Sequence, residues 1–291
     1  MEHSNTFSLK KIMKIACTEY VKWIINPRMI MILAMFMFVY DYIIVDMKEA
    51  ADMMSCGISV VEPFIAICNS ELLILIVPAV YIAIMGDFPR IDGNALFYIF
   101  RAGRTNWIFG QIIFLTMSAV TYLITIIAMS VLSILSYVDW GTRWSKVVTL
   151  FPQRFPDMAG AKVSRMITGR MYNNFKPDKA FYISVVLMLL YLIVIGMMLL
   201  TGFVMKRRAL GIGITAAVMS IGCGCILIKS KLKWLFPAAN ALPWLHFDMI
   251  YNRQFYRIEY SVVYMLALIV VALLIDILLI DEMDISKVDS M

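Results

Sequence analysis

The chain has 291 residues, of which 62% are apolar or aromatic and only 16% are charged. Water-soluble domains carry about 25% charged residues, and their cores cannot bury an apolar excess of this size. A lipid bilayer can, because a helix of roughly 20 mostly apolar residues crosses its hydrocarbon layer. The composition therefore excludes a water-soluble protein and predicts an integral membrane protein that has no large soluble domain.

The formal net charge of +6 comes from Lys and Arg residues in short clusters between the apolar runs. Clusters placed in this way suit the anionic headgroups of lipids better than the continuous phosphate backbone of a nucleic acid. We therefore expect membrane lipids, and no nucleic acid, among the partners of this chain.

Residues 8–25 form the clearest amphipathic segment of the sequence. Apolar side chains including Trp23 recur at helical spacing, and four lysines fall on the opposite face: Lys10, Lys11, Lys14 and Lys22. The pattern predicts a helix that lies in the membrane interface, with its lysines toward the headgroups. A helix packed on another part of the protein is the alternative. Asn26-Pro27 then ends this helix, because the residue before proline avoids helical geometry.

Six apolar segments after residue 28 are long enough to cross a membrane, at about 29–45, 63–86, 108–138, 181–205, 209–228 and 259–281. A short acidic loop with Asp46, Glu49 and Asp52 follows the first segment, and Glu71 and Pro78 interrupt the second. A polar hairpin occupies 87–107, the longest other segment is 139–180, and a tail covers 282–291. The predicted fold class is an all-α integral membrane protein with six transmembrane helices preceded by an amphipathic interfacial helix, the elbow helix.

Basic residues near the first spans predict the orientation. Five precede the first span and only Lys48 follows it, so 1–28 should be cytoplasmic. Six spans then place the hairpin 87–107 and the tail 282–291 on the cytoplasmic side of the cell membrane as well. The eight basic residues of 139–180 oppose this orientation, because that segment would be external.

Glu71 is the clearest ionisable residue inside a predicted span. A charged side chain at the bilayer centre costs about 2.5–3.5 kcal/mol on insertion scales and usually has a functional reason. Glu71 could couple transport to protons, face a wet cavity or contact a subunit. Asp41 and Asp276 lie near span ends, where extension of the side chain to the interface explains them. Small residues of the fifth span, including Gly211 and Gly213, predict close helix packing.

Several motifs of catalytic proteins are absent from the sequence. It contains no GxxxxGK[ST] phosphate loop, no HExxH, no GxSxG, and only two histidines. Its five cysteines are odd in number and form no CxxC pair, so neither a disulfide framework nor a zinc site is indicated. The chain is therefore predicted to be no enzyme by itself, to bind no cofactor, and to need another polypeptide if ATP is used.

Three segments resemble the permease subunit of type-2 ATP-binding-cassette (ABC) exporters. They are EYVKWIINPRMIMIL (19–33), DGNALFYIFRAGRTNWIFGQ (92–111) and PAANALPWLHF (237–247), within a six-span layout that covers nearly the whole chain. In that family the amino-terminal interfacial helix and the hairpin between spans two and three face the cytoplasm, and the hairpin couples the permease to its ATPase. The stretch 234–258 would correspond to the family's re-entrant helices, and 139–180 departs from its compact outer region.

The resemblance implies a permease that works as a dimer with a second permease chain and a separate cytoplasmic ABC ATPase, and exports an amphipathic peptide, drug or lipid. The implied ATPase-coupling residues are Asp92, Gly93, Phe97, Phe100, Arg101 and Arg104. Aromatic side chains flanked by arginines on a short helix can also dock in a groove of a soluble partner for general physical reasons. The alternative is a non-transporting membrane scaffold or sensor that anchors a cytoplasmic partner through the same hairpin.

Overall fold

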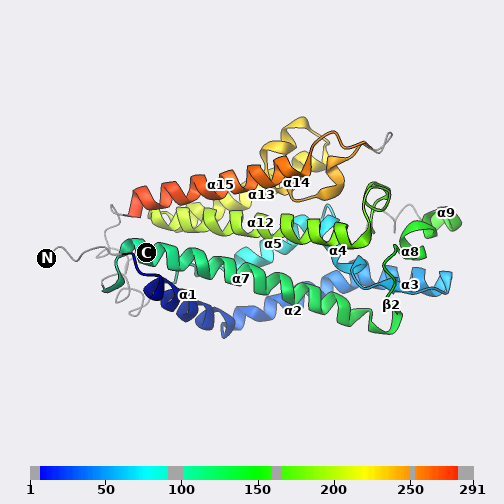
Figure 1. Cartoon of the computed structure of the whole chain (residues 1–291), viewed down its shortest axis with the longest axis horizontal. Coiled ribbons are helices and arrows are strands. Elements are labelled where there is room, and N and C mark those ends of the chain that lie inside the picture. Colours follow the sequence, from blue (N-terminus) through cyan, green and yellow to red (C-terminus); the bar gives the residue numbers. More distant parts are fainter. Residues whose placement is uncertain (1–6, 91–100, 159–165, 249–252, 281–291) are drawn as a thin grey trace.

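The computed structural model describes residues 7–90, 101–158, 166–248 and 253–280, and these are mostly helical. Within these residues, five helices or continuous helical runs are long and apolar enough to cross a membrane, and one bent pair of helices brings the total to as many as six. Together they form an elongated bundle whose long axis follows the helices (Figure 1). The arrangement is that of an all-α, multi-pass membrane protein, as the sequence predicts.

The first span is longer than predicted. Its helical run covers Pro27–Met54, and its parts are η1 (Pro27–Met29), α2 (Ile30–Val39), the π-helical turn η2 (Tyr40–Ile44) and α3 (Val45–Met54). The prediction of an acidic loop after residue 45 is wrong, because Met47, Ala50 and Ala51 bury an apolar face that keeps this stretch helical. At 28 residues the run is about 42 Å long, so α3 extends past a hydrocarbon layer of about 30 Å.

The second predicted span consists of two helices, α4 (Glu62–Asn69) and α5 (Leu73–Ile84), which meet at an angle of 87°. The prediction of an interruption at Glu71 is confirmed, whereas Pro78 lies inside α5 without ending it. The Ser70 hydroxyl accepts a hydrogen bond from the Leu73 amide at 3.4 Å and so caps the start of α5.

The third span, α7 (Arg104–Ser133), is followed by η3 (Leu135–Tyr137) and β2 (Val138–Asp139). Strand β2 pairs in parallel with β1 (Ile58–Ser59). The short helices of the next segment are α8 (Lys146–Thr149), α9 (Phe151–Arg154) and α11 (Gly169–Tyr172). The fully buried Glu62 carboxylate accepts hydrogen bonds from the amides of Ser145, at 2.6 Å, and Ser59, at 3.1 Å, and so anchors this segment to α4.

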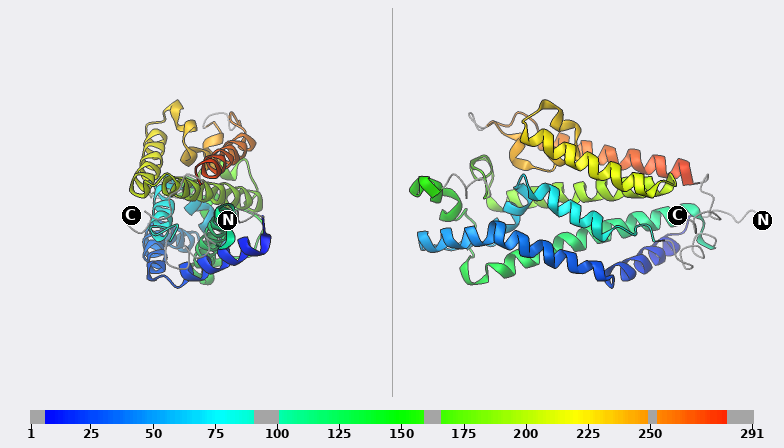
Figure 2. Two further views of the ribbon diagram at one scale, coloured as in Figure 1. Left: turned by 90° about the vertical axis from the view of Figure 1, so that its left-hand side faces the viewer. Right: turned by 180° about the vertical axis from the view of Figure 1, so that it is seen from behind.

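The remaining long helices are α12 (Pro177–Val204), α13 (Arg208–Leu227) and α15 (Ile258–Leu279). Three short helices connect α13 to α15: η5 (Lys231–Leu235), α14 (Pro237–Asn240) and η6 (Pro243–His246). Helix α1 (Leu9–Ile24), the end of α5, the start of α7 and the end of α15 share one end of the bundle, which we call the α1 end (Figures 1 and 2). Segments β1, β2, α8 and α9 lie at the opposite end, the α8 end.

Helix α12 is the most buried long helix, and it packs against α4, α7, α13 and α15. Gly202 of α12 and Gly211 of α13 meet backbone to backbone, since a Cβ atom on Gly211 would lie 2.7 Å from the Gly202 Cα. The predicted packing role is thus correct for Gly211. It is not correct for Gly213, whose Cβ would have no neighbour within 4 Å.

A buried polar cluster holds the connection between α13 and α15. The His246 Nε2 atom lies 2.7 Å from the Ser261 hydroxyl, which donates to Asn240 Oδ1 at 2.8 Å. The Asn240 amide in turn donates to the Trp234 carbonyl at 3.0 Å. This cluster ties η5, α14 and η6 to the first turn of α15, so the connection is a packed structure and not a loose loop.

We expect Gly211→Ala to destabilise the protein by about 1–3 kcal/mol, the usual cost of overpacking. Gly213→Ala is the matched control, and helix propensity predicts that it is neutral or slightly stabilising. Thermal unfolding of the purified protein in detergent measures both variants. An equal effect of the two substitutions would show that the α12–α13 crossing does not depend on this glycine contact.

Stability should fall with acid because of His246. Burial is the main cause that lowers the pKa of this imidazole from 6.5 to about 4. The neutral ring is therefore favoured in the folded state, so its full contribution is present above pH 6.5 and is lost as the pH falls through 4. The total loss is about 3 kcal/mol. The unfolding temperature of the wild type should drop more steeply from pH 7 to pH 4 than that of His246→Gln, and parallel curves would contradict the assignment.

Candidate functional site

The candidate site is at the α1 end, where α1 packs along α7. Ile15 of α1 lies so close to the backbone of α7 that a Cβ atom on Gly110 would be 2.7 Å from the Ile15 Cγ2. Two polar contacts fix the ends of this packing: the Ser8 amide donates to Asn106 Oδ1 at 3.0 Å, and the hydroxyls of Tyr20 and Thr121 are 2.8 Å apart. Helix α1 is therefore part of the bundle at this end.

The two faces of α1 differ as its sequence predicts. Lys10, Lys11 and Lys14 are exposed, and Lys22 is half-buried and forms an ion pair of 3.3 Å with the buried Glu19. Trp23 is buried against α7. The apolar face is divided, because one part packs on α7 while other large apolar residues of α1 stay exposed, namely Leu9, Met13, Val21 and Ile24. The packed-helix alternative therefore describes one part of this face, and the remainder is free to contact lipid.

Asp87, just after α5, connects three spans through ion pairs. Its Oδ2 atom is 2.9 Å from Arg28 Nη1 at the start of the first span, and its Oδ1 atom is 3.8 Å from Arg208 Nη2 at the start of α13. The Arg208 guanidinium also donates to the Gly86 carbonyl at 2.5 Å. All three charged side chains are one-third to one-half exposed, so this Asp87 cluster contributes orientation more than stability.

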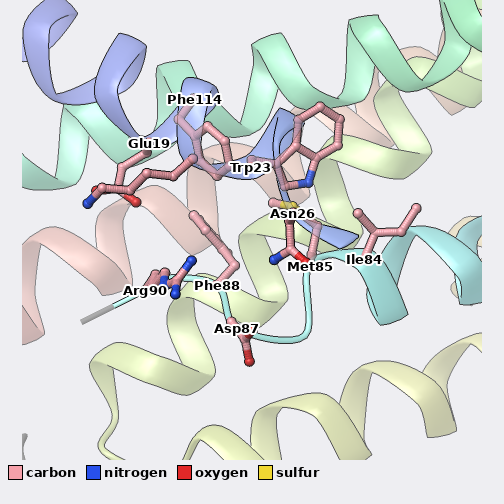
Figure 3. A pocket seen from close by; sticks show the side chains of 10 residues that line it. Glu19, Trp23, Asn26, Ile84, Met85, Asp87, Phe88, Arg90 and Phe114 are labelled. Atoms are coloured by element: carbon pink, nitrogen blue, oxygen red, sulfur yellow. The ribbon is translucent and has the colours of Figure 1, made fainter. Parts of the chain in front are cut away.

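Aromatic side chains pack the chain after Asp87 onto α1 and α7 (Figure 3). The buried Phe88 ring lies 5.5 Å from the Phe114 ring of α7, which in turn meets the Trp23 ring edge to face at 6.4 Å. Between these elements is a cavity of about 30 Å³, also lined by Glu19 and Asn26, which is large enough for about one water molecule. The first residues of the hairpin, at Asp87 and Phe88, thus pack against α1 and α7.

The predicted coupling residues are distributed unevenly over the described structure. Asp92, Gly93, Phe97 and Phe100 lie outside the described residues. Arg101 is an exposed helical residue, and Arg104 begins α7, where its guanidinium donates to the Ile280 carbonyl at 3.3 Å. This bond joins the start of α7 to the end of α15, a link separate from the Asp87 cluster.

Glu71 lies away from this site. It is exposed at the break between α4 and α5, where it lines a larger cavity with Arg170, Lys229 and Lys233. The sequence left three roles open for Glu71, and its location agrees with the second of them, that Glu71 faces a polar cavity.

Sequence reasoning missed two features. Basic residues near the spans served only to predict the orientation, although the opposite charges of Arg28, Asp87 and Arg208 at the ends of three apolar runs could have suggested the Asp87 cluster. The interpretation of Asp276 is wrong, because this residue is fully buried and does not extend to an interface. Its neighbour on α12 is Thr201, and neither carboxylate oxygen of Asp276 is in hydrogen-bond geometry with any described residue.

Comparisons of the chain with protein-family models, curated proteins and solved structures return no match. The fold and the site therefore define its class by themselves. The chain is a multi-pass helical membrane protein in which an amphipathic helix and a cluster of ion pairs organise one end of the bundle.

We expect Arg28 and Asp87 to be energetically coupled. In a double-mutant cycle with Arg28→Gln and Asp87→Asn, the coupling energy should be about 0.2–1 kcal/mol at low salt and smaller in 1 M NaCl, because both side chains are partly exposed. Unfolding of the purified protein in detergent provides the measurement. Arg207→Gln, next to Arg208 but exposed, should be additive with Asp87→Asn, and similar coupling in this control cycle would contradict the specific pairing.

Proposed function

We propose that the chain is the transmembrane permease subunit of an ATP-driven ABC exporter, working as a dimer with a separate cytoplasmic ATPase. In this proposal α4 and α5 together form one of six spans, α1 is the elbow helix, and the α1 end faces the cytoplasm. The observation that carries the proposal is the Asp87 cluster, which links the hairpin after α5 to the starts of the first and fifth spans.

The linkage provides a mechanical route from an ATPase to the spans. A partner that pushes the hairpin 87–107 would move Asp87, and with it Arg28 and Arg208, while Phe88 would transmit the same movement to α1 and α7. Helices packed in this way move as rigid bodies, and rocking of such bodies is the usual basis of alternating access. The chain transmits the movement and forms the pathway, and ATP hydrolysis by the ATPase provides the free energy.

The exposed helix faces support a dimeric pathway. Helix α5 contacts both α2 and α13, so spans one, two and five are neighbours. Large apolar side chains on the outer faces of α2 and α13 remain exposed, including Ile30, Met37, Ile214 and Ile221. A second permease chain that covers these faces would place the three spans at the dimer seam, where an amphipathic cargo could pass.

Two peripheral elements also agree with the proposal. The exposed apolar residues of α1 beside its lysines suit a helix at the membrane interface. The short helices η5, α14 and η6 lie between the last two long helices in chain order, and in this proposal they correspond to the family's re-entrant helices.

The central test is coupling to an ATPase. We expect affinity purification of the tagged chain in mild detergent to bring a soluble ATPase with it, and the complex to hydrolyse ATP faster than the ATPase alone. Arg101→Ala, in the hairpin, should reduce this stimulation at least tenfold without loss of membrane insertion, and Gly93 substitution should act likewise. Lys176→Ala, exposed just before α12, is the control and should keep full stimulation.

Capture of a kinase or peptidase in place of an ATPase would favour the scaffold or sensor function. Labelling of the hairpin tests the orientation independently. In a chain with the exposed Cys17 replaced by Ser, Arg101→Cys should react with an impermeant maleimide only after the cells are opened, whereas Trp140→Cys should react in intact cells. Reaction of Arg101→Cys from outside would place the hairpin beyond the reach of any cytoplasmic ATPase.

A further inference from the structure

A second polar cavity lies at the break between α4 and α5, at the opposite end of α5 from Asp87. Figure 1 shows where α4 and α5 lie in the bundle. Its volume is about 690 Å³. The residues that line it come from the break, from the start of α11, from the end of α13 with η5, and from η6. The polar, charged and aromatic residues of this lining include Asn69, Glu71, Thr168, Arg170, Lys229, Lys233 and Trp244. We call it the break cavity.

The break cavity carries an excess of positive charge. Three basic residues and one acidic residue line it, a net charge of +2. Asp248, outside the lining, also attracts Arg170, and counting it leaves +1. None of the three basic side chains forms an ion pair with a carboxylate in the described parts of the chain. The cavity therefore holds cations whose charge is not fully compensated.

Burial and mutual repulsion make these cations costly. Burial is the main cause that lowers the pKa of both Arg170 and Lys233. The charge of Arg170, and to a smaller extent that of Lys229, lowers the pKa of Lys233 further, whereas Glu71 acts in the opposite direction on both groups. Arg170 lies over the Trp244 ring, 5.0 Å from its centre, which holds the guanidinium in place without neutralising it. An anion between these side chains would relieve the repulsion, so the arrangement is that of an oxyanion site.

Two polar atoms on the wall of the break cavity are buried and have no hydrogen-bond partner among the described residues. Asn69 is 4% exposed, and its amide nitrogen donates to the Ile65 carbonyl and to the Ser184 hydroxyl, whereas its Oδ1 atom accepts no bond. The Thr168 hydroxyl is also unpaired. Buried polar groups are normally paired, so these two point to a ligand. The hydroxyl can donate to an oxyanion, and Asn69 Oδ1 can accept from a hydroxyl or ammonium group beside it.

The wall itself is firmly built. The Trp244 indole donates to the backbone carbonyl of Asn69 at 2.9 Å and so joins η6 to the break. Ile226 and Leu245 complete an apolar side of the cavity. The site is thus formed by packed elements that the fold holds in place before any ligand binds.

The surroundings indicate a lipid. Exposed apolar residues alternate with the basic residues between the end of α13 and η5: Leu227, Ile228, Leu232 and Leu235 are each at least 60% exposed. Apolar side chains of this kind beside lysines are typical of a membrane surface, where acyl chains contact the former and phosphates the latter. A soluble ligand would leave these apolar side chains without an apolar partner.

We propose that the break cavity binds the phosphate headgroup of an anionic phospholipid, with a hydroxyl or ammonium group of the same headgroup on Asn69. Arg170, Lys229 and Lys233 contact the phosphate, and Thr168 donates to it. The acyl chains lie along the exposed leucines of η5. This binding site does not depend on the proposed transport function, because no ATPase or second chain takes part in it.

Lipid binding to the full-length purified protein tests the proposal. Phosphatidylglycerol added to the detergent-solubilised chain should raise its unfolding temperature and appear as a bound adduct in native mass spectrometry, whereas phosphatidylcholine should bind at least tenfold more weakly. Arg170→Gln and Lys233→Gln should each weaken phosphatidylglycerol binding at least tenfold. Lys231→Gln is the matched control, because this exposed lysine of η5 does not line the cavity, and it should bind as the wild type does.

If the variants of the half-buried Arg170 and Lys233 fail to fold, Lys229→Gln still tests the proposal, since Lys229 is exposed and its substitution leaves the packing intact. Equal phosphatidylglycerol binding by Lys229→Gln and Lys231→Gln, or no preference over phosphatidylcholine, would overturn the proposal. Glycerol 3-phosphate that binds where phosphatidylglycerol does not would assign the cavity to a soluble phosphate and overturn the lipid source.

Discussion

A chain that crosses hydrocarbon must pair nearly every backbone polar group within itself, and unbroken helices satisfy this constraint. The break between α4 and α5 is the main departure from it here. The Trp244 indole donates a hydrogen bond to the Asn69 carbonyl, and the Ser70 hydroxyl accepts one from the Leu73 amide. These two backbone groups at the break are therefore satisfied by η6 and by the cap of α5. These contacts require the connection between α13 and α15 to fold back onto the bundle, and the His246 cluster holds it there.

The Asp87 cluster and the break cavity use charge in different ways. At the α1 end, Asp87 forms ion pairs with both Arg28 and Arg208, so these charges are engaged with one another and join three spans. At the break cavity the positive charges of Arg170 and Lys233 have too few acidic neighbours, so they remain available to a ligand. Charges that pair with one another suit a mechanical link, and basic side chains without an ion pair in the described residues suit the binding of an anion. The proposed functions of the two regions follow from this difference.

Local patterns predicted much of the α1 end. Helical spacing placed a helix close to Leu9–Ile24 with exposed lysines, and Asn26-Pro27 marked its end. The proposed coupling residues could be tested only in part, since four of the six lie outside the described structure. The Asp87 cluster was not predicted, because its three members are separated by more than 50 residues and no periodicity connects them. Pairing of distant charges depends on how the spans pack.

The sequence by itself determined the class of this protein, the approximate places of its apolar helices and the interruption at Glu71, because hydrophobic runs and charges act locally against a bilayer. Only the tertiary structure decided that the first span continues to Met54, that Asp276 is buried, and that Glu71 joins three basic residues in one cavity. Each of these depends on contacts between segments distant in the chain. Such contacts bury or expose a side chain regardless of what its immediate neighbours in the sequence predict.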